Sequence, residues 1–270
     1  MTVNITVYGQ TDIGLVRTVN EDAFVIADLT GGSVLQEQRI ARFEIGRQGV
    51  LLAVSDGIGG HKAGEVASAL VVESLRRSML RQAPSGPDGI DALMEEATKR
   101  ANREVWEAAH YPGRENMGAT LTALFVHGAT AHVAEVGDSR AYLLRGGVIE
   151  QVTRDQSYVQ LLMDAGALSP EEAQQSDFKN VILQAMGLAP KVTVALGRID
   201  LRLRDCFILC SDGLSNKVGP DELRSIVLAS PRLDAACVRM VETAKARGGE
   251  DNITVIVAGV SGDLPPLVAG

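Results

Sequence analysis

The chain has 270 residues, which is within the range of one large domain, and 46% of them are hydrophobic but only 4% aromatic, so we expect an aliphatic core. Its net charge of −8 argues against binding to nucleic acid or to an anionic membrane, because both require an excess of Lys and Arg. An acidic chain without linker-like segments gives no reason to expect an oligomer, so we predict a monomer.

The cysteines and the apolar segments indicate a reducing compartment. The chain has three cysteines, Cys206, Cys210 and Cys237, and no CxxC motif, so we expect neither a disulfide framework nor a zinc site. The first residues lack a signal-peptide pattern, and no apolar run reaches the ~18 residues of a membrane span. We therefore predict a cytoplasmic protein with no membrane partner.

The first third of the chain reads as strands followed by two helices. Strands are predicted over 3–9, 22–29 and 50–55, and residues 39–45 could add another. Apolar residues at helical spacing predict helices over 63–82 and about 88–110, separated by a segment rich in Pro and Gly. Asp88 or Asp91 could cap the second helix.

Strands then return, interrupted by a polar insert over 155–190. Short turns containing Gly separate the strands predicted over 118–126, 129–137, 140–146 and 148–153, which is typical of a meander. In the insert, Ser169 is predicted to cap a helix that starts at Pro170. The rest of the chain predicts strands over 191–201, 206–214 and 252–260, helices over 220–229 and 231–249, and a loose tail over 261–270.

This order of elements predicts an α+β fold. Two sets of strands and two pairs of helices indicate two antiparallel sheets with helices packed on their outer faces. The elements do not alternate between strand and helix, so a doubly wound parallel sheet is disfavoured.

Carboxylates recur at the ends of the predicted apolar strands. The positions are Asp56, Asp138 and Asp212 after strands, and Asp251 and the pair Glu21–Asp22 before strands. Strands of a compact sandwich converge at their ends, so these side chains would form a dense negative cluster that repels itself and is driven to protonate. A bound hard cation keeps such a cluster ionised, and ligation by oxygen alone suits Mg²⁺ or Mn²⁺.

Asp56 and Gly57 have further uses in such a site. Asp56 has two oxygens and could bridge two ions, and Gly57 lacks a Cβ, so its carbonyl could turn toward a metal. Two ions ~3.5–4 Å apart can hold a hydroxide between them and clamp a phosphoryl group. A single Asp-Gly pair after a strand is usually a turn, so the prediction depends on the whole set of carboxylates.

Several stretches resemble a known family. The chain is similar to the bacterial metal-dependent protein phosphatases (the PPM family, protein phosphatase 2C type), from about residue 5 to 258. The resemblance implies a single catalytic domain over 1–260, folded as a four-layer αββα sandwich with a mobile flap at about 155–190. The matching stretches are TDIGLVRTVNEDAF (11–24), LLAVSDGIGGHKAGEVAS (51–68), MGATLTALFV (117–126), AHVAEVGDSRAYLLRGG (131–147), ILCSDGLSN (208–216) and GGEDNITVIV (248–257).

The resemblance also implies an activity and a set of site residues. It implies that phosphoserine and phosphothreonine in proteins are hydrolysed in a single step by a hydroxide bridging two Mn²⁺ or Mg²⁺ ions, in opposition to a Ser/Thr protein kinase. The implied roles are metal bridging by Asp56, ligation by Gly57, Asp212 and Asp251, contact with metal-bound water by Glu21 and Asp22, a third metal site at Asp138 with Asp212, and phosphate binding by Arg17.

A few residues depart from the family pattern. Ile58 stands where some members carry a histidine proposed as general acid, and we interpret His61 as a loop-packing residue. Gln156 replaces a frequent histidine and Lys179 replaces a frequent arginine. Of the family's properties, substrate preference is therefore the one that transfers least well to this chain.

Two predictions concern residues beside the carboxylates. Ser55 and Ser211 precede Asp-Gly pairs without a neighbouring histidine base, so we expect them to hydrogen-bond carboxylates and not to act as nucleophiles. Arg140 could be a structural partner of Asp138.

Three alternatives stay open. The chain could be a phosphatase of one dedicated phosphorylated regulator, of the kind that antagonises an anti-sigma factor. It could be a family member that binds phosphoproteins without hydrolysing them, although such members typically lose metal-binding aspartates. It could also be an unrelated module that binds divalent cations and has no hydrolytic activity.

Overall fold

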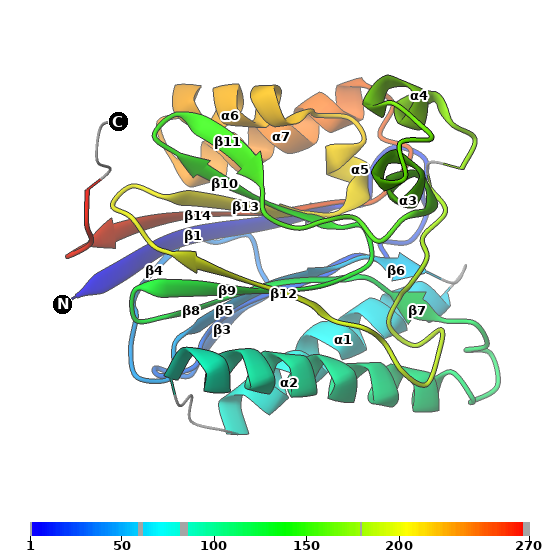
Figure 1. Ribbon diagram of the computed structural model, residues 1–270, viewed down its shortest axis with the longest axis horizontal. Coiled ribbons are helices and arrows are strands. Elements are labelled where there is room, and N and C mark those ends of the chain that lie inside the picture. Colours follow the sequence, from blue (N-terminus) through cyan, green and yellow to red (C-terminus); the bar gives the residue numbers. More distant parts are fainter. Residues whose placement is uncertain (1, 59–61, 82–85, 179, 267–270) are drawn as a thin grey trace.

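The computed structural model describes residues 2–58, 62–81, 86–178 and 180–266, which form four layers (Figure 1). Two antiparallel sheets lie face to face, and a pair of helices covers each outer face. The outer layers are α1 (Lys62–Arg81) with α2 (Gly86–Ala108) and α6 (Pro220–Ala229) with α7 (Leu233–Ala246). The predicted α+β sandwich is confirmed.

The first sheet lies under α6 and α7 and has the order β11-β10-β13-β14-β1-β4. Its longest strand pair is β1 with β14, which are antiparallel and in register from Val3↔Gly262 to Asp12↔Ile253. The strands are β1 (Val3–Asp12), β4 (Ala41–Glu44), β10 (Arg140–Arg145), β11 (Val148–Gln151), β13 (Cys206–Cys210) and β14 (Ile253–Gly262).

The second sheet lies over α1 and α2 and has the order β12-β9-β8-β5-β2-β3. A separate two-stranded ribbon, β6 with β7, lies at one end of the sandwich (Figure 1). The strands are β2 (Ala23–Asp28), β3 (Ser33–Leu35), β5 (Val50–Ser55), β6 (Gly57–Ile58), β7 (Gly118–Ala119), β8 (Leu121–His127), β9 (Thr130–Val136) and β12 (Ala195–Asp200).

Three buried apolar layers hold the four structural layers together. Side chains alternate across each strand, so Leu124 of β8 packs between the sheets while its neighbours Ala123 and Phe125 pack against α1 and α2. A third cluster, which includes Ile208 of β13 and Met240 of α7, fills the space on the other side. Aliphatic residues dominate all three layers, as the composition predicts.

The ends of two helices test the capping predictions. α4 (Pro170–Gln175) begins with the predicted Ser169 cap and has a complete capping box. The prediction that Asp88 or Asp91 caps α2 is wrong, because the helix already includes Gly86. Both aspartates bind Arg198 of β12 instead, so their charges tie the helix to the sheet.

Two segments differ from the predicted strands. The strand predicted over 206–214 ends at Cys210, and the short helix α5 (Asp212–Ser215) follows it. At the C-terminus, β14 runs on to Gly262, and Leu264 packs into the layer between the sheets. Residues 261–264, part of the predicted loose tail over 261–270, are therefore held against the sandwich by the buried Leu264 side chain, and residues 267–270 lie outside the described residues.

The insert over 155–190 contains α3 (Tyr158–Asp164) and α4, and we call this segment the flap. It lies at the end of the sandwich where α5, β6 and β7 also lie (Figure 1). Of the helices in the described ranges, none is long and apolar enough to cross a membrane.

Candidate metal and phosphate site

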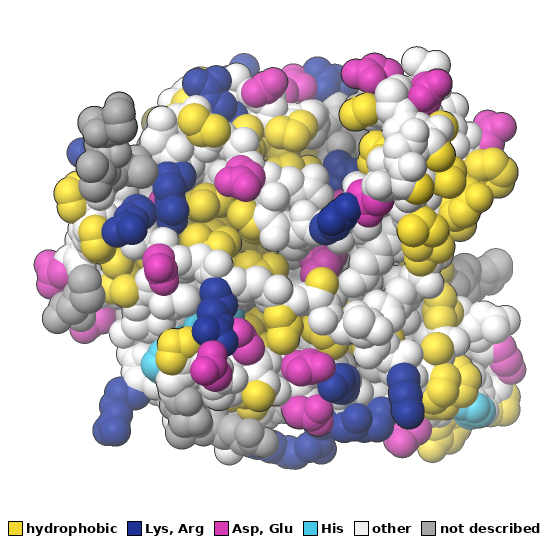
Figure 2. Space-filling model, in the orientation of Figure 1, with side chains coloured by type: hydrophobic (Ala, Val, Ile, Leu, Met, Phe, Trp, Pro, Cys, Tyr) yellow, Lys and Arg dark blue, Asp and Glu magenta, His cyan; other side chains and the backbone are white. Residues whose placement is uncertain are grey.

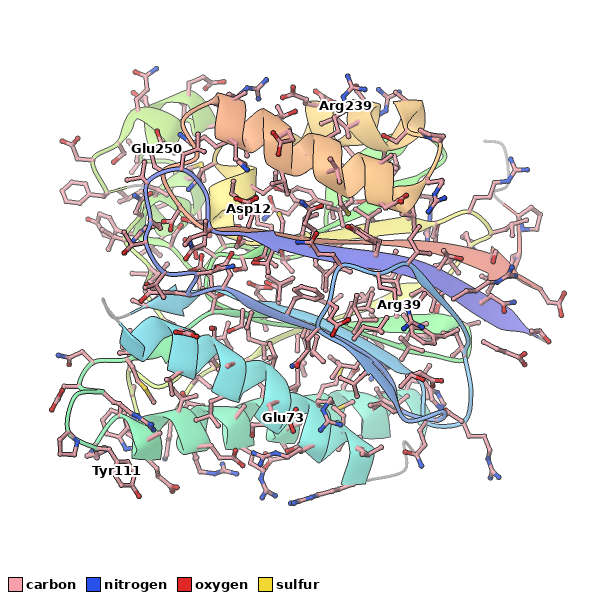
Figure 3. All side chains as sticks on the ribbon, turned by 180° about the vertical axis from the view of Figure 1, so that it is seen from behind. Asp12, Arg39, Glu73, Tyr111, Arg239 and Glu250 are labelled. Atoms are coloured by element: carbon pink, nitrogen blue, oxygen red, sulfur yellow. The ribbon has the colours of Figure 1, made fainter. Side chains whose placement is uncertain are left out.

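The strand ends that carry carboxylates meet at the flap end of the sandwich. β5 and β2 are antiparallel neighbours, so the residue after β5, Asp56, lies near Glu21 and Asp22, which precede β2. β13 and β14 are also antiparallel, which brings Asp212 near Asp251. Figure 3 shows Asp12, the last residue of β1, and Glu250, the neighbour of Asp251, at this same end.

These residues surround a cavity of about 270 Å³. It therefore collects six of the seven predicted metal-binding residues and the predicted phosphate-binding arginine. The lining residues are Arg17, Glu21, Asp56, Gly57, Ile58, Thr120, Asp138, Asn180, Ile182, Asp212 and Asp251.

Asp22, the seventh predicted residue, is buried and does not line the cavity. Its Oδ2 accepts a hydrogen bond from Ser211 Oγ at 2.8 Å, so the prediction that Ser211 binds a carboxylate is confirmed. Its Oδ1 has no hydrogen-bond partner among the described residues. The pKa of Asp22 is raised to about 7, chiefly by burial; the Thr254 and Ser211 hydroxyls lower it, and the nearby Asp212 and Asp251 charges add to the rise.

The cavity aspartates are held in a similarly unfavourable environment. Burial raises the pKa of Asp56 well above its usual value, and the charges of Asp22, Asp212 and Asp138 add to the shift. Burial and then Asp212 raise the pKa of Asp138 to about 7. Burial and Asp251 raise the pKa of Asp212 as well. In the absence of a cation, this cluster favours bound protons at neutral pH.

Arg17 lies at the mouth of the cavity, with its side chain half-exposed. Its Nη2 donates a hydrogen bond to Asp251 Oδ2 at 2.8 Å, and this bond raises the pKa of Arg17. Among the described residues, no three Asp, Glu, His or Cys side chains are grouped tightly enough to hold an ion as they stand. Pairing of Asp251 with Arg17 is consistent with this, because it directs one carboxylate toward the guanidinium.

Asn252 fixes the loop that carries Arg17, and the sequence analysis did not assign it a role. Its Nδ2 donates to the carbonyls of Ile13 and Val19, and its Oδ1 accepts from the Glu21 backbone N–H at 2.8 Å. One buried amide thus ties both ends of the loop to the start of β14. The sequence signal for this role is the position of Asn252 directly after Asp251, within the stretch 248–257 that resembles the family.

Thr120 is a second residue that the sequence analysis missed. Its Oγ1 accepts a hydrogen bond from the Asp56 backbone N–H at 2.9 Å and shares another with Ser139 Oγ. Ser55 Oγ donates to the Thr120 carbonyl at 2.6 Å, so the prediction that Ser55 binds a carboxylate is wrong. Together these bonds fix the backbone from which the Asp56 carboxylate projects.

Gly57 is required by close packing. A Cβ at this position would lie 2.3 Å from the Gly64 carbonyl oxygen and 2.5 Å from that of Glu21. Its N–H donates to the same Glu21 carbonyl, so the start of α1 and the Glu21 backbone meet at Gly57. Any side chain here would push apart elements that line the cavity.

Arg140 binds Asp155 and not Asp138, so the predicted pairing is wrong. Its Nε and Nη2 donate to the Asp155 carboxylate, with a shortest distance of 2.6 Å. This fork anchors the first residue of the flap to β10. A second cavity, of about 520 Å³, lies between the flap and α5 and shares Asp138 and Asp212 with the first.

Gln156 also anchors the flap. Its Oε1 accepts from the Gly137 N–H and from Gln184 Nε2, both at 2.9 Å. It therefore links the first residues of the flap to its last residues and to the turn before Asp138. His61 and Lys179 lie outside the described residues.

The donor set fits a hard divalent cation. All the polar groups are oxygens, apart from the Arg17 guanidinium and the amide of Asn180. Asp22 Oδ1 and Asp212 Oδ1 are buried and have no hydrogen-bond partner among the described residues. Buried carboxylate oxygens without partners are costly, and cation binding in their vicinity would offset that cost.

The chain belongs to the protein phosphatase 2C family, whose family model matches residues 29–254. The serine/threonine protein phosphatase PstP of Mycobacterium tuberculosis is 37% identical over 266 residues, which are 97% of this chain and 47% of the relative. The chain thus spans about half the length of that relative. The serine/threonine phosphatase stp of Listeria innocua is 34% identical over 92% of this chain and 93% of its own length.

Solved structures agree with this assignment. The crystal structure of the M. tuberculosis phosphatase PstP/Ppp has a TM-score of 0.80 at 35% identity and covers 96% of this chain and 100% of its own. The catalytic domain of PstP in complex with two manganese ions has a TM-score of 0.78 at 34% identity, with the same coverage of both chains.

Proposed function

We propose that this chain is a metal-dependent protein phosphatase that hydrolyses phosphoserine and phosphothreonine. The observation that carries the proposal is the cavity at the flap end, where carboxylates from five strand ends surround one space. Its family membership and the relatives named serine/threonine phosphatases support the same activity.

The proposed cofactors are two Mn²⁺ or Mg²⁺ ions, with a third site beside them. When bound, the ions would lower the pKa of a bound water molecule, so that hydroxide would be available to attack phosphorus near neutral pH. Support comes from the all-oxygen donor set and from the relative crystallised with two manganese ions. The proposed roles are bridging by Asp56, ligation by Gly57, Asp212 and Asp251, contact with bound water by Glu21 and Asp22, and the third site at Asp138 with Asp212.

Arg17 is proposed to bind the substrate phosphate. Its guanidinium is already at the cavity mouth, and a fork of N–H donors matches two phosphate oxygens. A phosphate would compete with the Asp251 carboxylate for the Nη2 donor. Arg17 would then neutralise charge that builds up on the phosphoryl oxygens during hydrolysis.

The proposed substrates are phosphorylated proteins, including a Ser/Thr protein kinase and the proteins that it modifies. A dedicated regulator phosphatase is the alternative within the same reaction. We further propose that the chain acts as a monomer in the cytoplasm.

Turnover of an aryl phosphate tests the activity most simply. We expect turnover with added Mn²⁺ and its loss in EDTA, followed by recovery when Mn²⁺ is returned in excess. Phosphoserine and phosphothreonine peptides from many proteins should then be hydrolysed, whereas a dedicated phosphatase would favour one. Full activity in a chelated sample would contradict the proposal, and so would Mn²⁺ binding without turnover.

A further inference from the structure

The flap forms part of the wall of the catalytic cavity. Ile182 and Asn180 line the same cavity as Arg17 and Asp56, although they lie far from both in the sequence. Asn180 and Ile182 are therefore close enough to contact a substrate segment whose phosphate is bound in the cavity. Contact with the flap would follow directly from binding at the site.

The backbone at Ile182 has the geometry of an open strand edge. Ile182 and Ser157 form an antiparallel bridge, held by bonds from Tyr158 N–H to the Val181 carbonyl and from Leu183 N–H to the Gln156 carbonyl, each 2.8 Å long. In this type of pair, the bridged residues direct their own N–H and C=O away from each other. No described residue hydrogen-bonds to the N–H or the C=O of Ile182.

Side-chain amides hold this edge in place. Gln184 Nε2 donates to the Thr193 carbonyl, and its Oε1 accepts from the Thr193 N–H, each at 2.7 Å. Gln184 also donates to Gln156, which in turn binds Gly137. The edge is therefore fixed before a partner arrives, which lowers the entropy cost of adding a strand to it.

Apolar side chains are exposed next to the same edge. Val181 and Leu183, on either side of Ile182, are 44% and 53% exposed, and Phe178 is 55% exposed. Figure 2 shows hydrophobic side chains gathered over the flap end of the molecule. An extended chain passing along the edge could cover part of this surface.

We propose that a phosphorylated substrate segment binds in an extended conformation and pairs one of its residues with Ile182 through two main-chain hydrogen bonds. The segment adds a short strand to the flap, as in β-augmentation, while its phosphate occupies the catalytic cavity. This inference rests on the proposed phosphatase activity. Main-chain pairing carries little sequence information, so the substrate class is unstructured phosphorylated segments of varied sequence.

A scan of backbone methylation in the substrate tests the proposal with the protein unaltered. One phosphoserine peptide is made in versions that each carry an N-methyl group at a different position near the phosphoserine. We expect kcat/KM to fall about tenfold for methylation at one position only, because the donor to the Ile182 carbonyl is lost. No loss at any position, or similar losses at several positions, would overturn the proposal.

Two substitutions of Ile182 distinguish the contribution of its main chain to peptide binding from that of its side chain. Ile182→Pro removes the N–H, and an edge position tolerates proline, whereas Ile182→Ala keeps the N–H. We expect the ratio of kcat/KM for the peptide to kcat/KM for an aryl phosphate to fall about tenfold in I182P and much less in I182A. Equal ratios in the two variants would contradict the proposal.

The aryl phosphate distinguishes this proposal from the proposed activity. Absence of Mn²⁺-dependent aryl phosphate turnover in the unaltered protein would reject the phosphatase itself. Normal aryl phosphate turnover with peptides insensitive to methylation would reject only the pairing with Ile182. Leu183→Ala is the matched control for lost apolar surface, since its own N–H already bonds within the flap.

Discussion

An aspartate lies next to each end of strand β13, and the two aspartates have opposite surroundings. At one end, Asp205 accepts two bonds from the Arg145 guanidinium, at 2.8 and 2.7 Å, and one from the Arg202 N–H. At the other end, Asp212 is partly buried and lies among other carboxylates, and its buried Oδ1 has no partner among the described residues. The strand between them is apolar and fully buried.

The comparison shows that burial of a carboxylate does not by itself indicate a functional site. A charge enclosed by a guanidinium fork is satisfied within the fold, and its role is structural. A carboxylate enclosed by like charges is costly to the fold, and the cost is compensated when a cation binds. The two ends of β13 should therefore respond to mutation in opposite ways.

The largest expected effect is on catalysis at the Asp212 end. Asp212→Asn should lower kcat for an aryl phosphate by about 10³-fold, because charge stabilisation by a metal contributes several kcal/mol. The folded structure should survive, since the substitution removes a repelling charge. Circular dichroism and steady-state kinetics at saturating Mn²⁺ check both statements, and near-normal turnover would remove Asp212 from the site.

The Asp205 end should show a large loss of stability instead. Asp205→Asn leaves the partly exposed Arg145 guanidinium without its counter-charge, and losing hydrogen bonds between charged groups costs about 1.5–3 kcal/mol. The free energy of unfolding, measured in urea with chelator present, should fall by about that amount. Turnover per folded molecule should stay unchanged, and a kcat as low as that of D212N would refute the distinction between the two ends.

The carboxylates at the flap end should also determine how the free energy of unfolding depends on pH. Asp22 and Asp138 have pKa values of about 7 in the folded protein and near 4 when unfolded, so the folded state holds more protons between these values. The free energy of unfolding of chelated protein should therefore fall as pH rises from about 4 to 7. Thermal melts in EDTA at a series of pH values measure this.

Two comparisons sharpen the pH experiment. Added Mn²⁺ should raise the melting temperature more at pH 8 than at pH 5, because the ions bind ionised carboxylates. Asp22→Asn should flatten the pH dependence in EDTA while keeping an oxygen for the Ser211 hydroxyl. A melting temperature that rises with pH in EDTA would contradict the account.

The smallest expected effect concerns the loop that carries Arg17. Asn252→Ala removes the side-chain bonds to Ile13, Val19 and Glu21, so Arg17 should lose its fixed position. We expect kcat/KM to fall about tenfold, mostly through KM, which is comparable to the loss of a few hydrogen bonds. Asn252→Asp is a matched variant, since it keeps an acceptor for Glu21 but loses the two donors.

The sequence was sufficient to place the strand ends but not the partners of the side chains there. Alternation of apolar residues and recurring Asp-Gly pairs locate Asp56 and Asp212 at strand ends, and antiparallel pairing then brings them together. No local pattern shows that Arg140 reaches Asp155, or that Arg17 pairs with Asp251, because each contact depends on how distant loops pack.

Hydrogen-bonding roles were missed for a related reason. Thr120 and Asn252 resemble ordinary polar residues beside strands, and only their neighbours in space reveal that they fix Asp56 and the Arg17 loop. The open edge at Ile182 arises from a single backbone bridge between Ile182 and Ser157 across the flap. Sequence periodicity does not predict an isolated bridge of this kind.

Calorimetric titration with Mn²⁺ at pH 7.5 tests the central claim most directly. The account predicts saturable binding of at least two ions per chain, with fewer ions bound by D212N and an unchanged number bound by D205N. The absence of saturable Mn²⁺ binding to the folded protein, or equal binding by both variants, would contradict the claim that the carboxylates at the flap end hold the ions.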